Sequence, residues 1–233
     1  MEQIVAPGPS LDIIKTAADS LVLPFRRPIL FVPFLFTLAL LYVLIVVVVT
    51  GTVLSVWAVG SVTTQQIVAL SGAVALIIFI SVIAVEAITE LTVRSELGRD
   101  LDLGDAVVHA LIRFPVTLAT VAVMTAGIVI GMVLLIVPGL VVGARWFLAP
   151  NTALLGGRGV RDAIGLSWQM TGEHLLPLTG LVLVVGVGTM ILTIPLSHLP
   201  VFGHLAAAWL GFAWGGIALA MAYVRLGGPV DLG

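Results

Sequence analysis

The sequence predicts an all-α integral membrane protein, a polytopic helical bundle of six transmembrane helices arranged as three hairpins. Hydrophobic residues make up 60% of the 233 positions and charged residues only 9%, whereas soluble domains carry about 25% charged residues. Long stretches contain no charge at all: between Arg27 and Glu86, over 114–144 and over 175–224. This composition excludes a soluble enzyme, a nucleic-acid-binding protein and a disordered chain.

The charge gaps set the positions of the spans. Because one span needs about 20 apolar residues, the first and last gaps each hold two helices and a turn. The middle gap turns at Pro138-Gly139, a dipeptide that ends helices. The expected spans are 28–50, 66–92, 115–136, 140–155, 176–196 and 204–225.

The fourth span is the least regular of the six. Residues 140–155 would cover about 24 Å as a helix, less than a hydrocarbon core of about 30 Å, and they include Arg145 and Pro150. A re-entrant segment is therefore the alternative. Six spans place every other Lys and Arg on one side, which the positive-inside rule makes cytoplasmic. We therefore expect a multi-pass protein of the cell membrane, without a cleaved signal and with both termini in the cytoplasm.

A short amphipathic stretch precedes each pair of spans. Residues 10–23 follow a Ser10 N-cap signal and carry Leu11, Ile14, Ala18 and Leu21 on one face, and 105–114 and 161–171 repeat the pattern. Such stretches are typical of helices that lie in the membrane interface. Since Asp105-Ala106 aligns with Asp162-Ala163, a single domain of three units (10–92, 101–157 and 160–226) is one interpretation. Three hairpins with charged linkers are the other.

Glycine spacing points to close helix contacts. Small residues mark helix interfaces in lipid, where pairing helices gains no hydrophobic free energy. GxxxG pairs occur at Gly127 and Gly131, at Gly139 and Gly143, and at Gly211 and Gly215. They fit either a compact monomer or a homo-oligomer face.

Charged residues inside spans are candidate functional residues, because burying charge in lipid is costly. Glu90 precedes Arg94 by four residues, which predicts an ion pair on one helix face. If the second and fourth spans touch, Glu86 and Asn151 share a depth and Arg145 can extend towards them. We expect a buried Glu86–Asn151–Arg145 cluster. It would be either a neutralising pair that fixes helix register, or a site for a lipid headgroup, a small anion or a proton path.

No catalytic or metal-binding pattern accompanies these charges. With no cysteine and no second ligand at HxxxH spacing, neither a metal site nor a cofactor is expected. Ser167 lacks the G-x-S-x-G context of a nucleophile elbow. The sequence therefore predicts that the protein is not an enzyme.

The segment PGLVVGARWFLAP at 138–150, with GRGVRDAI at 157–164 and SWQMTG at 167–172, resembles a motif of a broad superfamily of uncharacterised prokaryotic six-span membrane proteins. That superfamily includes the membrane domain fused ahead of some glycerophosphodiester phosphodiesterases. The resemblance implies a helical membrane module in which Arg145, Pro150, Asp162 and Ser167 recur, with a cytoplasmic elbow between the fourth and fifth spans that includes Arg158. It implies no phosphodiesterase activity, because the catalytic barrel and its acidic metal-binding motif are missing.

Two functions follow as expectations. The first is a non-enzymatic membrane module that binds membrane lipids or a partner protein, with the in-plane helices as its working surface. The alternative is a small-solute transporter or channel with the polar cluster of Glu86 and Arg145. Against transport, the spans contain few polar residues to line an aqueous path.

Overall fold

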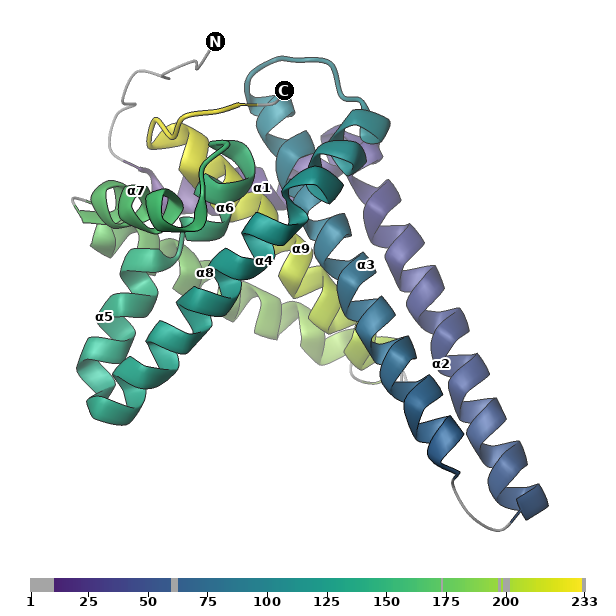
Figure 1. Cartoon of the computed structure of the whole chain (residues 1–233). Coiled ribbons are helices and arrows are strands. Elements are labelled where there is room, and N and C mark those ends of the chain that lie inside the picture. Colours follow the sequence, from purple (N-terminus) through teal and green to yellow (C-terminus); the bar gives the residue numbers. More distant parts are fainter. Residues whose placement is uncertain (1–10, 60–62, 173, 197, 199–201, 232–233) are drawn as a thin grey trace.

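The computed structural model describes residues 11–59, 63–172, 174–196, 198 and 202–231. The fold is all-helical, with 87% of residues in helices and no strand in this described part of the chain. Figure 1 shows the elements in order. They are α1 (Ile13–Arg26), the 3₁₀ turn η1 (Pro28–Leu30), α2 (Phe31–Val59), α3 (Thr64–Glu96), α4 (Leu103–Leu134), α5 (Ile136–Trp146), α6 (Ala149–Leu155), α7 (Val160–Gly172), α8 (Leu175–Leu196) and α9 (Phe202–Arg225).

Four helical segments are long and apolar enough to cross a membrane. They lie at Pro28–Val53, Thr64–Glu96, Leu103–Leu134 and Leu175–Leu196, and each overlaps one expected span. The helix α9 has 24 residues, or about 36 Å, and its apolar stretch Leu210–Arg225 is shorter than the other four. The all-α class and the long apolar helices of the sequence prediction are therefore confirmed.

The single helix expected over 140–155 is wrong. The chain forms α5 and α6 instead, about 17 and 11 Å long, and neither crosses a hydrocarbon core alone. Pro150 stands in the first turn of α6. Because proline has no N–H and its ring clashes with the carbonyl four residues earlier, here Trp146, a continuous helix is broken at this point.

Two of the three amphipathic stretches are separate helices, α1 and α7, and the third is not. Residues 105–114 are the first turns of α4, which continues through Pro115 to Leu134. The proposed unit of an in-plane helix plus a hairpin therefore does not describe the middle of the chain. Ser10 lies outside the described residues, and Asp12 caps α1 by accepting a bond from the Lys15 N–H at 3.0 Å.

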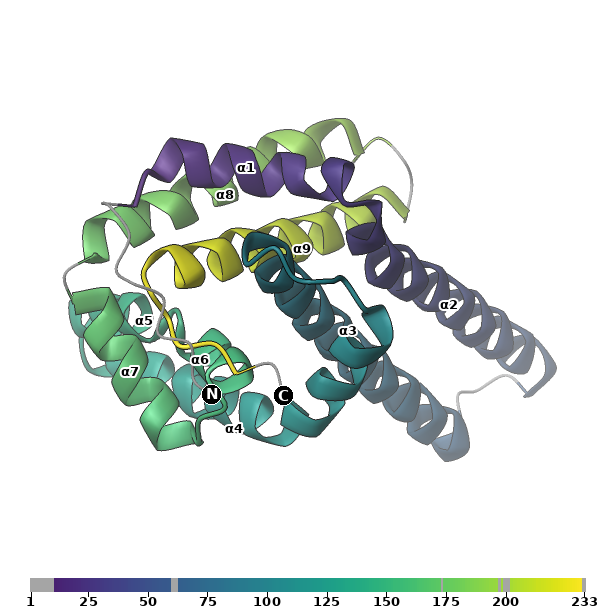
Figure 2. The same ribbon diagram turned by 90° about the horizontal axis from the view of Figure 1, so that it is seen from above.

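The hairpins share one end of the bundle and separate towards the other. The α2–α3 and α4–α5 hairpins diverge downwards in Figure 1, while the α3–α4 connection, α6, α7 and the described chain ends lie at the top. Seen from above in Figure 2, α1 lies along α8 and α9. The buried core sits at the shared end, where α3, α6 and α9 contribute Leu91, Leu154 and Tyr223.

Away from that end, the apolar helices are not covered by the protein. Only 11–17% of the most apolar window of each of the four long helices is buried. Val47, Ile67 and Val133 are among the exposed aliphatic side chains. Contiguous apolar surface of this extent requires a non-aqueous environment or a partner, and continuous helices satisfy their backbone groups within lipid.

The outward face of α1 carries Ile14, Ala18 and Leu21 of the expected apolar stripe, whereas Leu11 is buried. Ile14 and Leu21, predicted on a common apolar face, are exposed, whereas Thr16, Ala17 and Ser20 are buried against α8 and α9. Small side chains let α1 approach its neighbours closely, and the larger apolar ones point out of the protein. The apolar stripe of α1 thus faces the surroundings of the bundle.

Candidate functional site

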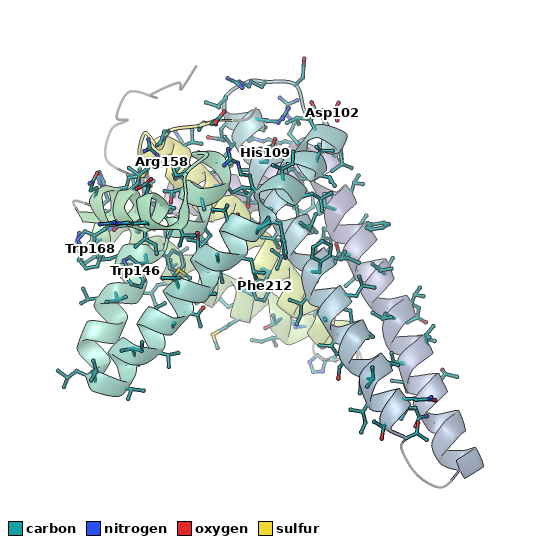
Figure 3. The ribbon with its side chains drawn as sticks, in the orientation of Figure 1. Asp102, His109, Trp146, Arg158, Trp168 and Phe212 are labelled. Atoms are coloured by element: carbon teal, nitrogen blue, oxygen red, sulfur yellow. The ribbon has the colours of Figure 1, made fainter. Side chains whose placement is uncertain are left out.

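A buried ionic cluster joins α3 to α4 at the shared end. Glu90 is fully buried and accepts bonds from the Arg94 Nη2 atom at 2.7 Å and the Arg94 Nε atom at 3.0 Å. Its other oxygen lies 2.6 Å from Nδ1 of His109 on α4, which Figure 3 labels near the top of the bundle. Asp105 adds a weaker contact with Arg94 at 3.9 Å. Burying a carboxylate is tolerated when donors satisfy both of its oxygens.

The Glu90–Arg94 pair confirms the sequence prediction, whereas the role of His109 was missed. His109 lies four residues after Asp105 on α4, so the two share a helix face. That spacing signals a polar face but does not say which helix it meets. The contact depends on the pairing of α3 with α4, which no local pattern contains.

One turn deeper on α3, Glu86 has different surroundings. Its side chain is only 4% exposed, and neither carboxyl oxygen has a hydrogen-bond partner among the described residues. Thr117 on α4 faces this carboxyl, but its hydroxyl donates to the Arg113 carbonyl oxygen at 3.3 Å. The burial of the Glu86 carboxyl is thus offset by no hydrogen bond that the described residues donate within bonding geometry.

Arg145 belongs to an elbow between α5 and α7. Its guanidinium carbon lies 5.2 Å from the ring centre of Trp168, and its Nη1 atom reaches the Trp168 carbonyl oxygen at 3.5 Å. The Arg145 carbonyl, at the end of α5, accepts bonds of 2.9 Å from the hydroxyls of Ser167 and Thr171. Ser167 is therefore a structural residue that closes the broken helix against α7.

The predicted Glu86–Asn151–Arg145 cluster is not linked by hydrogen bonds. Asn151 on α6 is 8% exposed and its amide nitrogen lacks a partner among the described residues, as does Arg145 Nε. A cluster of these three side chains therefore stays a prediction, and no hydrogen bond between described residues joins them. Of the remaining candidates, Arg158 lies in the turn after α6 and Asp162 is exposed in the first turn of α7, where an acidic group suits the helix dipole.

The GxxxG glycines serve contacts within the chain. A Cβ atom on Gly127 would overlap the ring of Trp146 on α5, and one on Gly139 would lie 2.5 Å from the Met132 backbone nitrogen. A Cβ atom on Gly211 would meet Thr189 of α8 at 2.6 Å. Gly215, in contrast, faces open space. These contacts close the α4–α5 and α8–α9 hairpins, as the monomer interpretation of the glycines requires.

Two apolar grooves open on the surface of the described bundle. The first, the α1 groove, has a volume of about 290 Å³ and lies between α1, η1, α2 and α9, with Phe25, Leu30, Phe34, Ala213 and Trp214 among its lining residues. The second, the α8–α9 groove, has a volume of about 360 Å³ and is lined by Phe147, Gly186, Phe212 and Gly215 among others. Both are near the lower size limit of ligand pockets.

No group of three or more His, Asp or Glu side chains placed to hold a metal ion is found among the described residues. The polar groups of the site are the ionic cluster of Glu90, the Glu86 carboxyl and the Arg145 elbow between α5 and α7.

The chain matches no family model, and it shows no significant similarity to a curated protein or to a solved structure.

Proposed function

We propose that the protein is a six-crossing, non-enzymatic membrane module that binds bilayer lipid at its charged end, through the in-plane helices α1 and α7. The observation that carries the proposal is the exposed apolar surface of α2, α3, α4 and α8, of which so little is buried by the protein itself. Lipid is the medium that accommodates such an apolar surface around the circumference of a helical bundle.

The proposed membrane crossings are assigned from the helices that meet at the shared end of the bundle. In this proposal α2, α3, α4, α8 and α9 each cross once, and the broken pair α5 and α6 makes the fourth crossing. Basic residues lie in or beside the segments at the shared end, namely α1, the α3–α4 connection, the α6–α7 turn and the end of α9. By the positive-inside rule this end is cytoplasmic.

Cysteine labelling tests this topology directly, because the natural chain has no cysteine. Asp100→Cys, in the α3–α4 connection, should react with an impermeant maleimide only after the cells are permeabilised. Thr64→Cys, at the start of α3, should react in intact cells. Val47→Cys inside α2 is the control and should resist labelling in both. Labelling of Asp100→Cys in intact cells would overturn the orientation, and release of the protein by alkaline carbonate would overturn membrane insertion.

Glu86 favours one second candidate, a proton-coupled path for a small solute. An uncompensated carboxyl inside a span is costly and is expected where a protein needs a titratable group. Protein in liposomes containing a pH-sensitive dye should then conduct protons, and Glu86→Gln should abolish the flux. Absence of flux from the wild-type protein removes this candidate and leaves the lipid-binding module.

A further inference from the structure

We propose that the α1 groove holds an acyl chain of an anionic phospholipid, whose phosphate is bound by Arg26 and Arg27. This proposal rests on the membrane module proposed above and names its ligand and its site. The occupant is a lipid of the surrounding bilayer, because the groove opens beside the exposed apolar face of α1.

The groove suits an acyl chain. Side chains from five separate helices and from η1 converge on it, and nearly all the atoms they present are carbon. Its one polar feature is already satisfied, since the Trp214 indole N–H donates to the Ser20 hydroxyl at 2.9 Å and that hydroxyl donates to the Ala17 carbonyl oxygen at 2.8 Å. An apolar ligand therefore displaces no hydrogen bond when it enters.

Two cations stand at the edge of this groove. Arg26 ends α1 and Arg27 follows it, and in the chain they are flanked by two lining residues of the groove, Phe25 and Leu30. The rings of Phe25 and Phe31 contact each other with centroids 5.5 Å apart, which brings both flanks of the arginine pair together. Since the residues on either side of the pair line the groove, we infer that both arginines lie at its mouth.

These arginines are exposed and have no acidic partner in the part of the chain that the structure describes. Asp19, the acidic residue preceding them on α1, is bound to Arg225 at 2.7 Å. A guanidinium group binds phosphate oxygens through paired hydrogen bonds. Cytoplasmic leaflets supply anionic headgroups to basic segments at the membrane surface. An anionic phospholipid thus matches the groove and its two cations at once.

The α8–α9 groove supplies an internal comparison. It is similar in size and is also apolar, but the cation nearest to it in the chain, Arg145, is stacked on Trp168. Apolar shape alone therefore does not distinguish the two grooves. The pair Arg26 and Arg27 distinguishes the α1 groove from the α8–α9 groove. It predicts headgroup selectivity at the α1 groove only.

The experiment measures lipid selectivity with spin-labelled phosphatidylglycerol and phosphatidylcholine, using the purified full chain in phosphatidylcholine bilayers. We expect the wild-type protein to immobilise phosphatidylglycerol about fivefold or more over phosphatidylcholine, as interaction with one to two basic residues implies. The double variant Arg26→Gln/Arg27→Gln should lower this ratio to about one. The matched control Arg99→Gln/Arg113→Gln removes two cations from the same end, outside α1 and α7, and should retain the wild-type ratio.

A second pair of variants tests the groove itself. Ala213→Leu fills the α1 groove and should remove the selectively immobilised lipid, whereas Gly215→Leu fills the α8–α9 groove and should leave it in place. No selectivity in the wild-type protein, or equal losses in the two double variants, would overturn the site. Such a result leaves the membrane module intact if cysteine labelling still gives the proposed topology, so the two failures are distinguishable.

Discussion

Glu86 and Glu90 lie one turn apart on α3 and are both buried, yet only Glu90 is compensated. The Glu90 carboxylate accepts bonds from Arg94 and contacts His109 at 2.6 Å, while both oxygens of Glu86 lack a hydrogen-bond partner among the described residues. Charge removal at the two positions should therefore have opposite effects on stability.

At Glu90, the variant Glu90→Gln should destabilise the protein by about 3 kcal/mol, because removing one member of a buried pair leaves the other without its partner. The measurement is reversible unfolding in mixed micelles, followed by tryptophan fluorescence. Asp100→Asn is the control, since Asp100 is exposed in the α3–α4 connection, and its effect should stay within about 0.5 kcal/mol.

A double-mutant cycle separates the free-energy contribution of the Glu90–His109 contact from that of the other contacts of Glu90. Glu90→Gln, His109→Gln and their combination should give a coupling free energy of about 1 kcal/mol or more, as residues in one hydrogen-bond network do. Additive losses in this cycle would show that the 2.6 Å contact contributes nothing specific to stability.

At Glu86, the variant Glu86→Leu should stabilise the protein, because it replaces an uncompensated buried carboxyl with an apolar side chain. The same unfolding measurement should give a gain of about 1 kcal/mol or more. A loss of stability comparable to that of Glu90→Gln would mean that the Glu86 carboxyl has a bonding partner after all. A gain accompanied by loss of proton flux would instead favour the transport candidate.

Gly139→Ala should disrupt the α4–α5 hairpin. The new methyl group would lie 2.5 Å from the Met132 backbone nitrogen and 2.8 Å from its Cα, and backbone atoms cannot rotate away as a side chain does. Overpacking of this kind costs about 1–3 kcal/mol. Gly143→Ala is matched on the same helix, since its methyl group would meet Ile128 at an ordinary 3.5 Å, and it should unfold like the wild type.

Ser20→Ala should loosen α1 from the bundle. Without the Ser20 hydroxyl, the Trp214 indole N–H, which is buried, loses its acceptor, at a cost of about 1–3 kcal/mol. Faster proteolysis within α1 and a shift of tryptophan fluorescence should accompany the loss. Ser71→Ala is the control, because the exposed Ser71 hydroxyl bonds only to the Ile67 carbonyl of its own helix. Equal effects of the two substitutions would contradict the proposed tie.

The sequence predicts the long helices well, because hydropathy and charge gaps are local properties of the chain. It predicts the Glu90–Arg94 pair for the same reason, since a spacing of four residues fixes a common helix face. The broken helix at Pro150 was open to prediction from the missing N–H. The distribution of Lys and Arg favoured one crossing over 140–155, and that distribution carries no information about a break within the crossing.

Contacts between helices are what the sequence does not contain. His109 meets Glu90 only because α4 packs against α3, and Ser167 meets the Arg145 carbonyl only because α7 folds back over the end of α5. The apolar face of α1 was recognised, but the burial of Leu11, Thr16 and Ser20 was not, because it depends on the packing of α1 against α8 and α9. Periodicity identifies a face without identifying what covers it.

The chain after α9 returns to the middle of the molecule. The Tyr223 hydroxyl donates to the Pro229 carbonyl oxygen at 2.6 Å, the Asp231 N–H donates to the Leu155 carbonyl oxygen at 2.6 Å, and Arg113 lies 3.8 Å from the Asp231 carboxylate. These contacts hold the last described residues against α4 and α6, although α4 and α6 are distant from these residues in the sequence. Residues 226–231 and the end of α6 should therefore open as one cooperative unit, with a shared rate of amide hydrogen exchange.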